Sequence, residues 1–405
     1  PLNGSIITMS ETTKSSLRHP LVLGCVLLGV AAIPDAMVVP VLHDLTVERF
    51  GVSEGAAHAF MAVNFIGALL VVGLLAFLNR SISTSVLLMI SAATSCGLMA
   101  AMATVDSWWA LLGLRCLDGG ADLIMLSIPF RMIASCGTTK HYGMRMGVSF
   151  SVMFLSLAFG AGIGSVIGRG DATNVLWASS LTSGILLLIV AILRSSVDNT
   201  SSSPRPKDGA NPLVPSEWIG ASFLALDRGL SALVSVTLPI LITSGFNVSL
   251  KTLGIALAGM FVVLAIFSAP AGLIADRIGG IKVRVIASIL CGLGLAGLGL
   301  MRWLPPVVIL SPCLLLYGAG AAGLMPSAFS ASVRREASTL VFSTLQAAGQ
   351  GGYALGIVAG LLLVSFIALP PETLLTSLFP VAGVLFIGAN LLLATSLRHL
   401  RGKVG

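Results

Sequence analysis

Long apolar segments recur along the whole chain, and they restrict its fold more than any other feature. Runs of 18 or more mostly apolar residues are each long enough to cross a hydrocarbon core of roughly 30 Å. Only 10% of the 405 residues are charged and the mean hydropathy is +1.00, whereas soluble domains carry about 25% charge. Strands of a membrane barrel would alternate over about 10 residues, a pattern that is not seen. The sequence therefore predicts an all-α membrane protein and argues against a soluble enzyme.

The apolar runs divide into about twelve spans. We expect them at about 20–43, 55–78, 83–104, 107–130, 144–168, 172–194, 217–244, 251–275, 283–304, 306–330, 338–367 and 373–397. A segment rich in Ser, Pro and Gly interrupts them and cannot bury apolar surface, so we expect a flexible connector. The predicted organisation is a tail at 1–19, six-helix bundles at 20–196 and 217–397, a cytoplasmic linker at 197–216 and a tail at 398–405. Residues 1–8 precede Met9 and are set aside from the fold.

The distribution of basic residues predicts the orientation. With the N-terminus in the cytoplasm, 17 of the 23 Lys and Arg residues lie on the inner side of the predicted spans and four on the outer side. This bias follows the positive-inside rule with both termini cytoplasmic, and shifting the count by one helix would destroy it. The net charge of +7 is thus explained by topology, and no nucleic-acid partner is expected.

Two glycine stripes indicate an internal repeat. Each stripe has a glycine at every fourth residue, which lets another helix backbone approach closely. The stripes are Gly160, Gly164 and Gly168, and Gly352, Gly356 and Gly360, an offset of 192 residues. Generic membrane packing also produces such stripes, but their recurrence in both halves favours a duplicated architecture around a midplane site.

One loop motif indicates a family. Its residues are Gly272, Asp276, Arg277, Gly279, Lys282 and Arg284. The spacing resembles the cytoplasmic signature G-x-x-x-D-R-x-G-x-x-K/R of the major facilitator superfamily. The resemblance implies two six-helix bundles and a gating role for this loop. Gly279 permits a tight turn, and the basic residues can pair with Asp276 and with neighbouring helix ends. In the first half, Gly73 to Arg80 is a degraded copy with Asn79 in place of the acid.

Two shorter motifs resemble the proton-coupled drug and small-molecule exporter branch of that superfamily. Arg115 to Gly119 matches its R-x-x-x-G element, and Asp35 to Pro40 matches an acidic D-x-x-x-x-P stretch. The branch also has a Gly-Pro pair in its fifth helix, where this chain has Gly160-Ala161. The resemblance implies a proton site near Arg115.

Charges within the spans are candidate functional residues, because each costs roughly 2.5–3.5 kcal/mol at a helix centre on insertion scales. Arg115, Asp118 and Asp122 share one helical face, so the arginine can pair with one acid and leave the other to take a proton. The alternative is a static ion network. Asp35 is a further candidate for substrate or proton binding, or for an ion pair with Arg115.

The second half contributes Asp227 and Arg228. Adjacent helical residues point about 100° apart, so each needs a partner elsewhere. Asp227 is the counterpart of Asp35, whereas Arg228 either binds an anion or pairs with an acid of the other half. Gln346 and Gln350, four residues apart, either bind substrate or join helices.

These features predict a secondary transporter that exports a small organic molecule in exchange for protons. An uptake symporter of an organic anion or metabolite is the alternative, and a non-transporting sensor or assembly factor is a third. No ATP-binding motif, metal-ligand spacing or cofactor motif is present, and the six cysteines are scattered. The expected partners are the substrate, protons and the lipid bilayer, in a monomer of the bacterial plasma membrane.

Overall fold

The computed structural model describes residues 20–42, 44–52, 54–78, 82–136, 141–201, 213–246, 248, 250–333, 339–366 and 369–402. The predicted tails at 1–19 and the last residues 403–405 lie outside this set, as do Asn79 and Arg80 of the degraded motif copy. The described residues are almost entirely helical.

The spans confirm the prediction of an all-α membrane fold with about twelve crossings. In the first half the helices are α2 (Pro20–Val38), α3 (Glu54–Leu78), α4 (Thr84–Thr104), α5 (Trp108–Ser135), α6 (Tyr142–Ile167), α7 (Thr173–Ile192) and α8 (Arg194–Ser201). In the second they are α9 (Pro215–Ala232), α10 (Leu238–Phe246), α11 (Leu250–Ile278), α12 (Gly280–Gly297), α13 (Pro306–Ser332), α14 (Thr339–Phe366) and α15 (Pro371–Gly402). A π-helical segment, Leu233–Thr237, joins α9 to α10 into one span.

Ten described helical segments are long and apolar enough to cross a membrane by length and composition. The other two crossings are α3 and α5, and the latter has 28 residues but carries the charges of the candidate site. Buried charges within a span are compatible with a membrane crossing where they have partners, so the polarity of α5 is not evidence against one.

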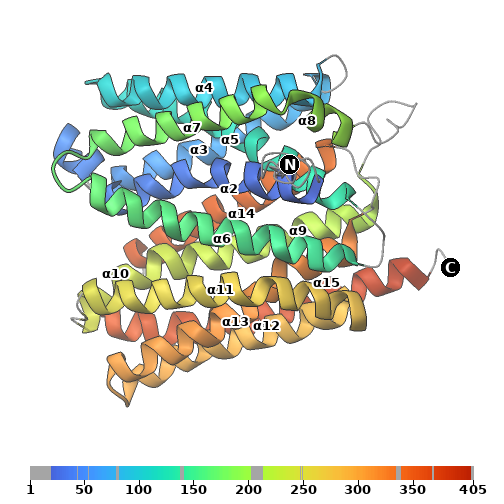
Figure 1. Cartoon of the computed structure of the whole chain (residues 1–405). Helices are drawn as coiled ribbons and strands as arrows, with labels where there is room; N and C mark the ends of the chain where they lie inside the picture. The colour runs from blue at the N-terminus through green and yellow to red at the C-terminus, as the bar shows by residue number, and fades with distance from the viewer. Residues whose placement is uncertain are drawn as a thin grey trace, which may run out of the picture.

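The helices form two stacked halves (Figure 1). The blue-to-green helices α2–α7 lie above the yellow-to-red helices α9–α15, with α6 and α11 running side by side along the boundary. Helix α14 also reaches across the boundary, to α3 and α5.

Both glycine stripes allow the close helix approach that the sequence predicts, and each packs against the first helix of its own half. A Cβ atom on Gly164 would lie 2.0 Å from the carbonyl oxygen of Met37 on α2. A Cβ atom on Gly352 would lie 2.0 Å from the carbonyl oxygen of Ala225 on α9. The equivalent contacts α6–α2 and α14–α9 support a repeated architecture in the two halves.

The predicted flexible linker is wrong in its first part. Helix α8 covers Arg194–Ser201, buries Val197 fully in the core of the first half, and places Asp198 at the start of α4. Asp198 accepts hydrogen bonds from the backbone N–H and the hydroxyl of Ser85, at 3.0 and 2.7 Å. One apolar anchor and one helix cap thus order a segment whose composition is polar. Residues 202–212 lie outside the described set.

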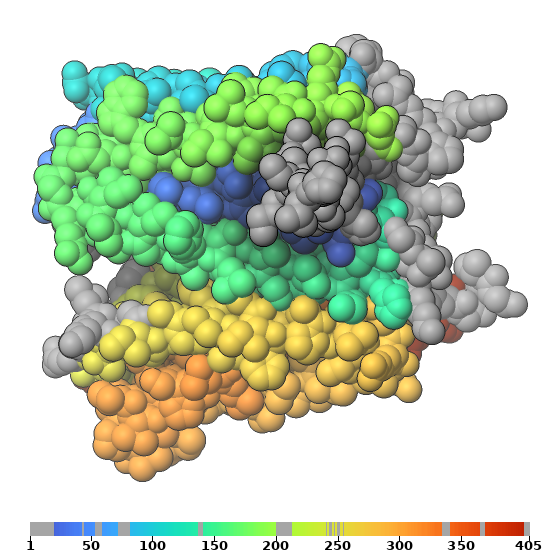
Figure 2. Space-filling model, viewed as in Figure 1, coloured from blue at the N-terminus to red at the C-terminus, as the bar shows by residue number. Residues whose placement is uncertain are grey.

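The two halves close against each other at one end, which we call the linker end because α8 and the end of α15 lie there (Figure 1). A Cβ atom on Gly272 of α11 would lie 2.0 Å from the carbonyl oxygen of Gly143 on α6, and one on Gly147 would lie 2.3 Å from that of Ser268. Toward the opposite end, at the left of Figure 2, the green surface of α6 and the yellow surface of α11 part. The described structure is therefore closed at the linker end.

Candidate functional site

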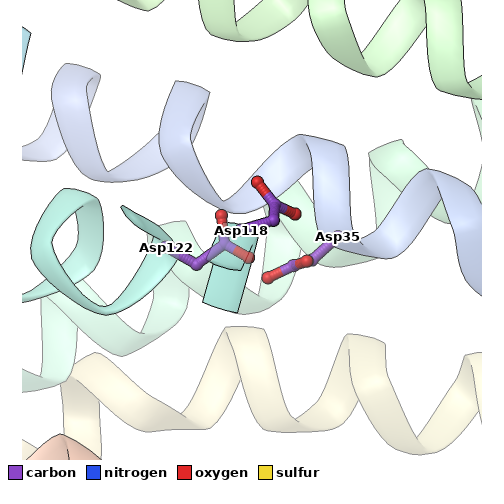
Figure 3. A group of neighbouring side chains, drawn as sticks. All are labelled: Asp35, Asp118 and Asp122. Atoms are coloured by element: carbon purple, nitrogen blue, oxygen red, sulfur yellow. The ribbon is translucent and has the colours of Figure 1, made fainter. Parts of the chain in front are cut away.

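Three carboxylates from two helices converge on one guanidinium in the first half. Helix α5 presents Arg115, Asp118 and Asp122 on one face. Helix α2 brings Asp35 to the two aspartates of α5 (Figure 3). Arg115 bonds Asp118 at 2.6 Å and Asp35 at 2.7 Å, and its nearest distance to Asp122 is 3.7 Å. We call these four residues the acidic cluster. The structure thus brings together all the charged candidates that the sequence proposed for the first half.

Helix α3 completes the acidic cluster. The amide of Asn64 donates to Asp122 Oδ2 at 3.2 Å, and the Arg115 guanidinium lies 5.3 Å from the centroid of the Phe60 ring. A Cβ atom on Gly119 would lie 1.9 Å from the carbonyl oxygen of Asn64, so only glycine allows this approach of α3 and α5. The supporting role of Gly119 was missed, although the Gly-Gly pair after Asp118 in the sequence is a signal for close helix contact.

The exposure of the three acids differs in a way that suits proton exchange. The side chains of Asp118 and Asp122 are buried, whereas that of Asp35 is 30% exposed. Three carboxylates and one guanidinium carry an excess of two negative charges if all are ionised. A low-dielectric interior disfavours such an excess, so bound protons would stabilise the arrangement.

In the second half, Asp227 and Arg284 form a separate buried pair. Arg284 donates to both carboxylate oxygens of Asp227, and Nη1 lies 2.6 Å from Oδ2. Its Nε donates to Asn390 at 2.7 Å, and it also donates to the backbone oxygens of Leu324 and Phe223. Every nitrogen of this guanidinium is thereby satisfied within the bundle.

This geometry corrects the prediction that Arg284 belongs to the basic loop cluster and pairs with Asp276. Helix α12 begins at Gly280, so Arg284 already lies one turn into the span and points into the bundle. Its buried neighbours on the same face, Ala287, Ser288 and Cys291, follow helical spacing and are the sequence signal that was overlooked.

Arg228 lies next to Asp227 but shares none of these bonds. It makes no hydrogen bond or ion pair in the part of the chain that the structure describes. Its side chain packs against Gly349 of α14, where a Cβ atom would lie 3.3 Å from Arg228 Cγ. The phenols of Tyr353 and Tyr317 are close enough to interact with it electrostatically. Arg228 is thus an unsatisfied cation among hydroxyl groups.

The two glutamines predicted either to bind substrate or to join helices lie on α14, on the same helix as Tyr353. Gln346 and Gln350 are partly exposed, and neither makes a hydrogen bond within the described ranges. They lie about two turns and one turn from Tyr353. Neither of the two readings is excluded by this geometry.

At the linker end, the motif aspartate caps a helix of the other half. Asp276 accepts hydrogen bonds from the backbone N–H groups of Gly143 and Met144, at 2.6 and 2.8 Å. These N–H groups lie in the first turn of α6 and have no partner within the helix. A carboxylate at this position is stabilised by both hydrogen bonds and by the helix dipole. The turn after α11 requires glycine at Gly279, whose φ is 97°. Arg277 and Lys282 are exposed and make no ion pair among the described residues.

Four phenylalanines fill the boundary above this cap. Phe130 and Phe150 of the first half meet Phe329 and Phe342 of the second, with successive ring centroids 5.0, 5.8 and 5.8 Å apart. All four are essentially inaccessible to solvent. The rings therefore form a packed contact between the two halves.

Comparison with known proteins agrees with this architecture. A profile described as Major Facilitator Superfamily matches residues 24–230, which is half of the chain. The chain belongs to the Major Facilitator Superfamily. A search of curated protein sequences finds no match.

Solved superfamily structures share the fold at low sequence identity. The human organic anion transporter MFSD10 (TETRAN) is 17% identical with a TM-score of 0.66, covering 91% of this chain and 99% of its own. A bacterial homologue of the iron transporter ferroportin, in an outward-facing state, is 13% identical with a TM-score of 0.69, covering 94% and 99%. The transporter FucP, in the outward conformation, is 13% identical with a TM-score of 0.64, covering 92% and 98%. At these identities the likeness concerns the fold.

A metal ion fits the acidic cluster poorly, although the superfamily fold is also found in a ferroportin homologue. One oxygen from each of Asp35, Asp118 and Asp122 lies within 4.8 Å of the others. The Arg115 guanidinium already bonds two of these acids and repels a cation from the same position. The cluster is better suited to protons, which bind to a carboxylate oxygen without displacing the arginine.

Proposed function

We propose that this superfamily member is a proton-coupled secondary transporter that moves a small organic molecule by alternating access. The observation that supports the proposal best is the acidic cluster, in which three carboxylates surround one arginine within a span. An ion gradient is the expected energy source, because the sequence has no ATP-binding motif.

Asp122 is the main proton carrier in this proposal. It is the acid farthest from the Arg115 guanidinium, at 3.7 Å against 2.6 and 2.7 Å for the other two. Protonation of Asp122 therefore sacrifices the least attraction to the arginine. The partly exposed Asp35 passes protons between the open end and the buried acids.

Substrate movement would follow from rocking of the two halves. Under the positive-inside rule the linker end is cytoplasmic, so the described arrangement corresponds to an outward-open state with the phenylalanines as the inner gate. The Asp276 cap on α6 stabilises this state, and it must break before the inner side opens. Asp227 has a structural role in this scheme, because Arg284 holds both of its oxygens.

Proton-driven export remains the first candidate direction, since the motifs at Asp35 and Arg115 resemble those of an exporter branch. The specific observation that favours the second candidate, uptake of an anion with protons, is the unpaired Arg228. We place the protein in the bacterial plasma membrane as a monomer, with both termini in the cytoplasm.

Infrared spectroscopy of the reconstituted protein tests the proton site without knowledge of the substrate. A pH titration should reveal the carbonyl band of a protonated buried carboxyl group, and Asp122→Asn should remove it. The matched control is Asp171→Asn, because Asp171 lies in an exposed loop where it caps Thr173. A buried carboxyl band that persists unchanged in Asp122→Asn, in Asp118→Asn and in Asp35→Asn would refute the assignment.

A further inference from the structure

An arginine inside a membrane span needs a counter-charge, and Arg228 has none within the described protein. The nearest acid is its neighbour Asp227, but Arg284 occupies both oxygens of that carboxylate. The acids of the first half are engaged with Arg115. Charged residues in spans that lack a protein partner face a water-filled cavity or a ligand. Arg228 retains partial exposure, as a binding residue requires.

The groups around Arg228 are hydrogen-bond donors. The Tyr353 hydroxyl lies 2.8 Å from Ser235 Oγ, and the Tyr317 hydroxyl lies 3.4 Å from Ser231 Oγ. In the Tyr353–Ser235 pair, one hydroxyl can donate to the other and leave a second proton free for a ligand. Ser231 donates its own proton to the backbone oxygen of Asp227 at 2.8 Å, so Tyr317 can donate its proton either to Ser231 or to a ligand. A guanidinium flanked by phenols matches the planar, multiply accepting oxygens of a carboxylate.

The glycine stripe of α14 explains why this position exists. Gly349 lies against the stem of Arg228, and Gly352 lets the α14 backbone touch α9. A larger residue at either position would separate the two helices and remove Tyr353 from the arginine. The close contact therefore holds α9, which carries Arg228, against α14, which carries Tyr353.

We propose that Arg228, with Tyr317 and Tyr353, binds the carboxylate of an organic anion, and that this anion is the transported substrate. The inference rests on the proposed function, since it names the substrate class of the same transporter. The body of the anion would face α3, because the Phe65 ring lies 5.2 Å from the Tyr353 ring. An apolar or aromatic body suits that neighbour.

The anion site and the acidic cluster are linked through α3. Phe65 contacts Tyr353 of the anion site, and the adjacent Asn64 donates to Asp122. The second half has an excess positive charge at Arg228, and the first half has an excess of negative charge. An anion bound at Arg228 and a proton bound at the acidic cluster would neutralise these two excess charges. Binding of the anion therefore favours binding of the proton, and the reverse. This coupling favours the second candidate direction, movement of proton and anion together, over export in exchange for protons.

Thermal unfolding of the detergent-purified protein with matched ligand pairs tests the site. The probes are benzoate with benzamide, nicotinate with nicotinamide, and lactate with lactamide. We expect at least one carboxylate, and not its amide, to raise the melting temperature of the unmodified protein. In Arg228→Gln the apparent Kd should rise about 10- to 100-fold, since a hydrogen bond to a charged group contributes about one to two decades of affinity.

Two further variants control this test. Arg228→Lys should retain part of the affinity, and Arg398→Gln, at an exposed site near the end of α15, should retain all of it. Equal stabilisation by the amides, equal affinity in Arg228→Gln, or no response to any of the three carboxylates would overturn the assignment. The infrared carboxyl band of Asp122 should persist in Arg228→Gln, so loss of the anion site and loss of the proton site are separate results.

Discussion

Arg228 and Arg284 lie in the same half of the bundle, yet their removal should affect stability in opposite ways. The perturbation is replacement of each by Met, which keeps an unbranched side chain and removes the charge. Arg284→Met should destabilise the protein strongly, and Arg228→Met should leave the ligand-free stability unchanged or higher. The reason is that, within the described residues, Arg284 donates hydrogen bonds that its replacement would remove, whereas Arg228 donates none.

The magnitude follows from the contacts. Arg284 donates five hydrogen bonds, and at about 0.6 kcal/mol for each in a membrane protein their loss costs about 3 kcal/mol. This agrees with the roughly 3–5 kcal/mol measured when one partner of a buried ion pair is removed. Arg228 donates none among the described residues, so its replacement should change the free energy of unfolding by less than about 1 kcal/mol or raise it.

Reversible unfolding in mixed micelles, followed by circular dichroism, measures both free energies. The double variant Arg284→Met/Asp227→Leu should recover at least half of the loss, because it removes the uncompensated carboxylate along with the arginine. Equal destabilisation by Arg228→Met and Arg284→Met would refute the reasoning, since it would mean that Arg228 is bonded within the protein. If the double variant does not recover stability, the shape of the replaced side chains, and not the unpaired charge, accounts for the lost free energy of unfolding.

Three further outcomes concern the closed linker end. Gly272→Val should open this end, because a Cβ atom there would lie 2.0 Å from a backbone oxygen. The accessibility of a cysteine introduced in place of a phenylalanine of the inner gate should then rise. The control Gly259→Ala, where a Cβ atom has only a 3.5 Å contact, should not change that accessibility. Asp276→Asn should shift the same equilibrium by about 1–2 kcal/mol toward the open state, measured by spin-label distances between α6 and α11, through loss of a charged helix cap. Phe329→Ala should let protons pass the inner gate, and a proton-flux assay in liposomes should detect this passage. A proton flux equal to that of liposomes with the unmodified protein would contradict the role of the rings.

The sequence predicts the spans because hydrocarbon thickness and backbone hydrogen bonding leave a long apolar helix as the simplest solution. It also predicts the shared face of Arg115, Asp118 and Asp122, since helical spacing is local. The convergence of Asp35 on that face depends on how α2 packs against α5, which no local pattern specifies. The family resemblance identified the residue types but not their distances.

The errors have a common cause. Arg284 was assigned to the loop because it belongs to a basic motif, but the turn at Gly279 starts a new helix one residue later, so Arg284 points inward. The linker was predicted to be flexible from its average composition, whereas two residues, Val197 and Asp198, fix its first five positions, 197–201, as part of a helix. Motif membership and mean polarity describe a segment, whereas burial is decided residue by residue.

The pair formed by Asp227 and Arg284 also explains the position of its neighbour. Two hydrogen bonds to α12 fix the rotation of α9 about its own axis. The next residue, about 100° further round the helix, then has to point away from that pair, toward α14 and α13. One face of α9 is thus anchored by a fully satisfied ion pair so that the other can present an unsatisfied cation. A change that broke the Asp227–Arg284 pair without altering Arg228 should therefore weaken anion binding as well as stability. The Arg284→Met/Asp227→Leu variant recovers stability without restoring the hydrogen bonds. It therefore separates the effect on anion binding from the effect on stability.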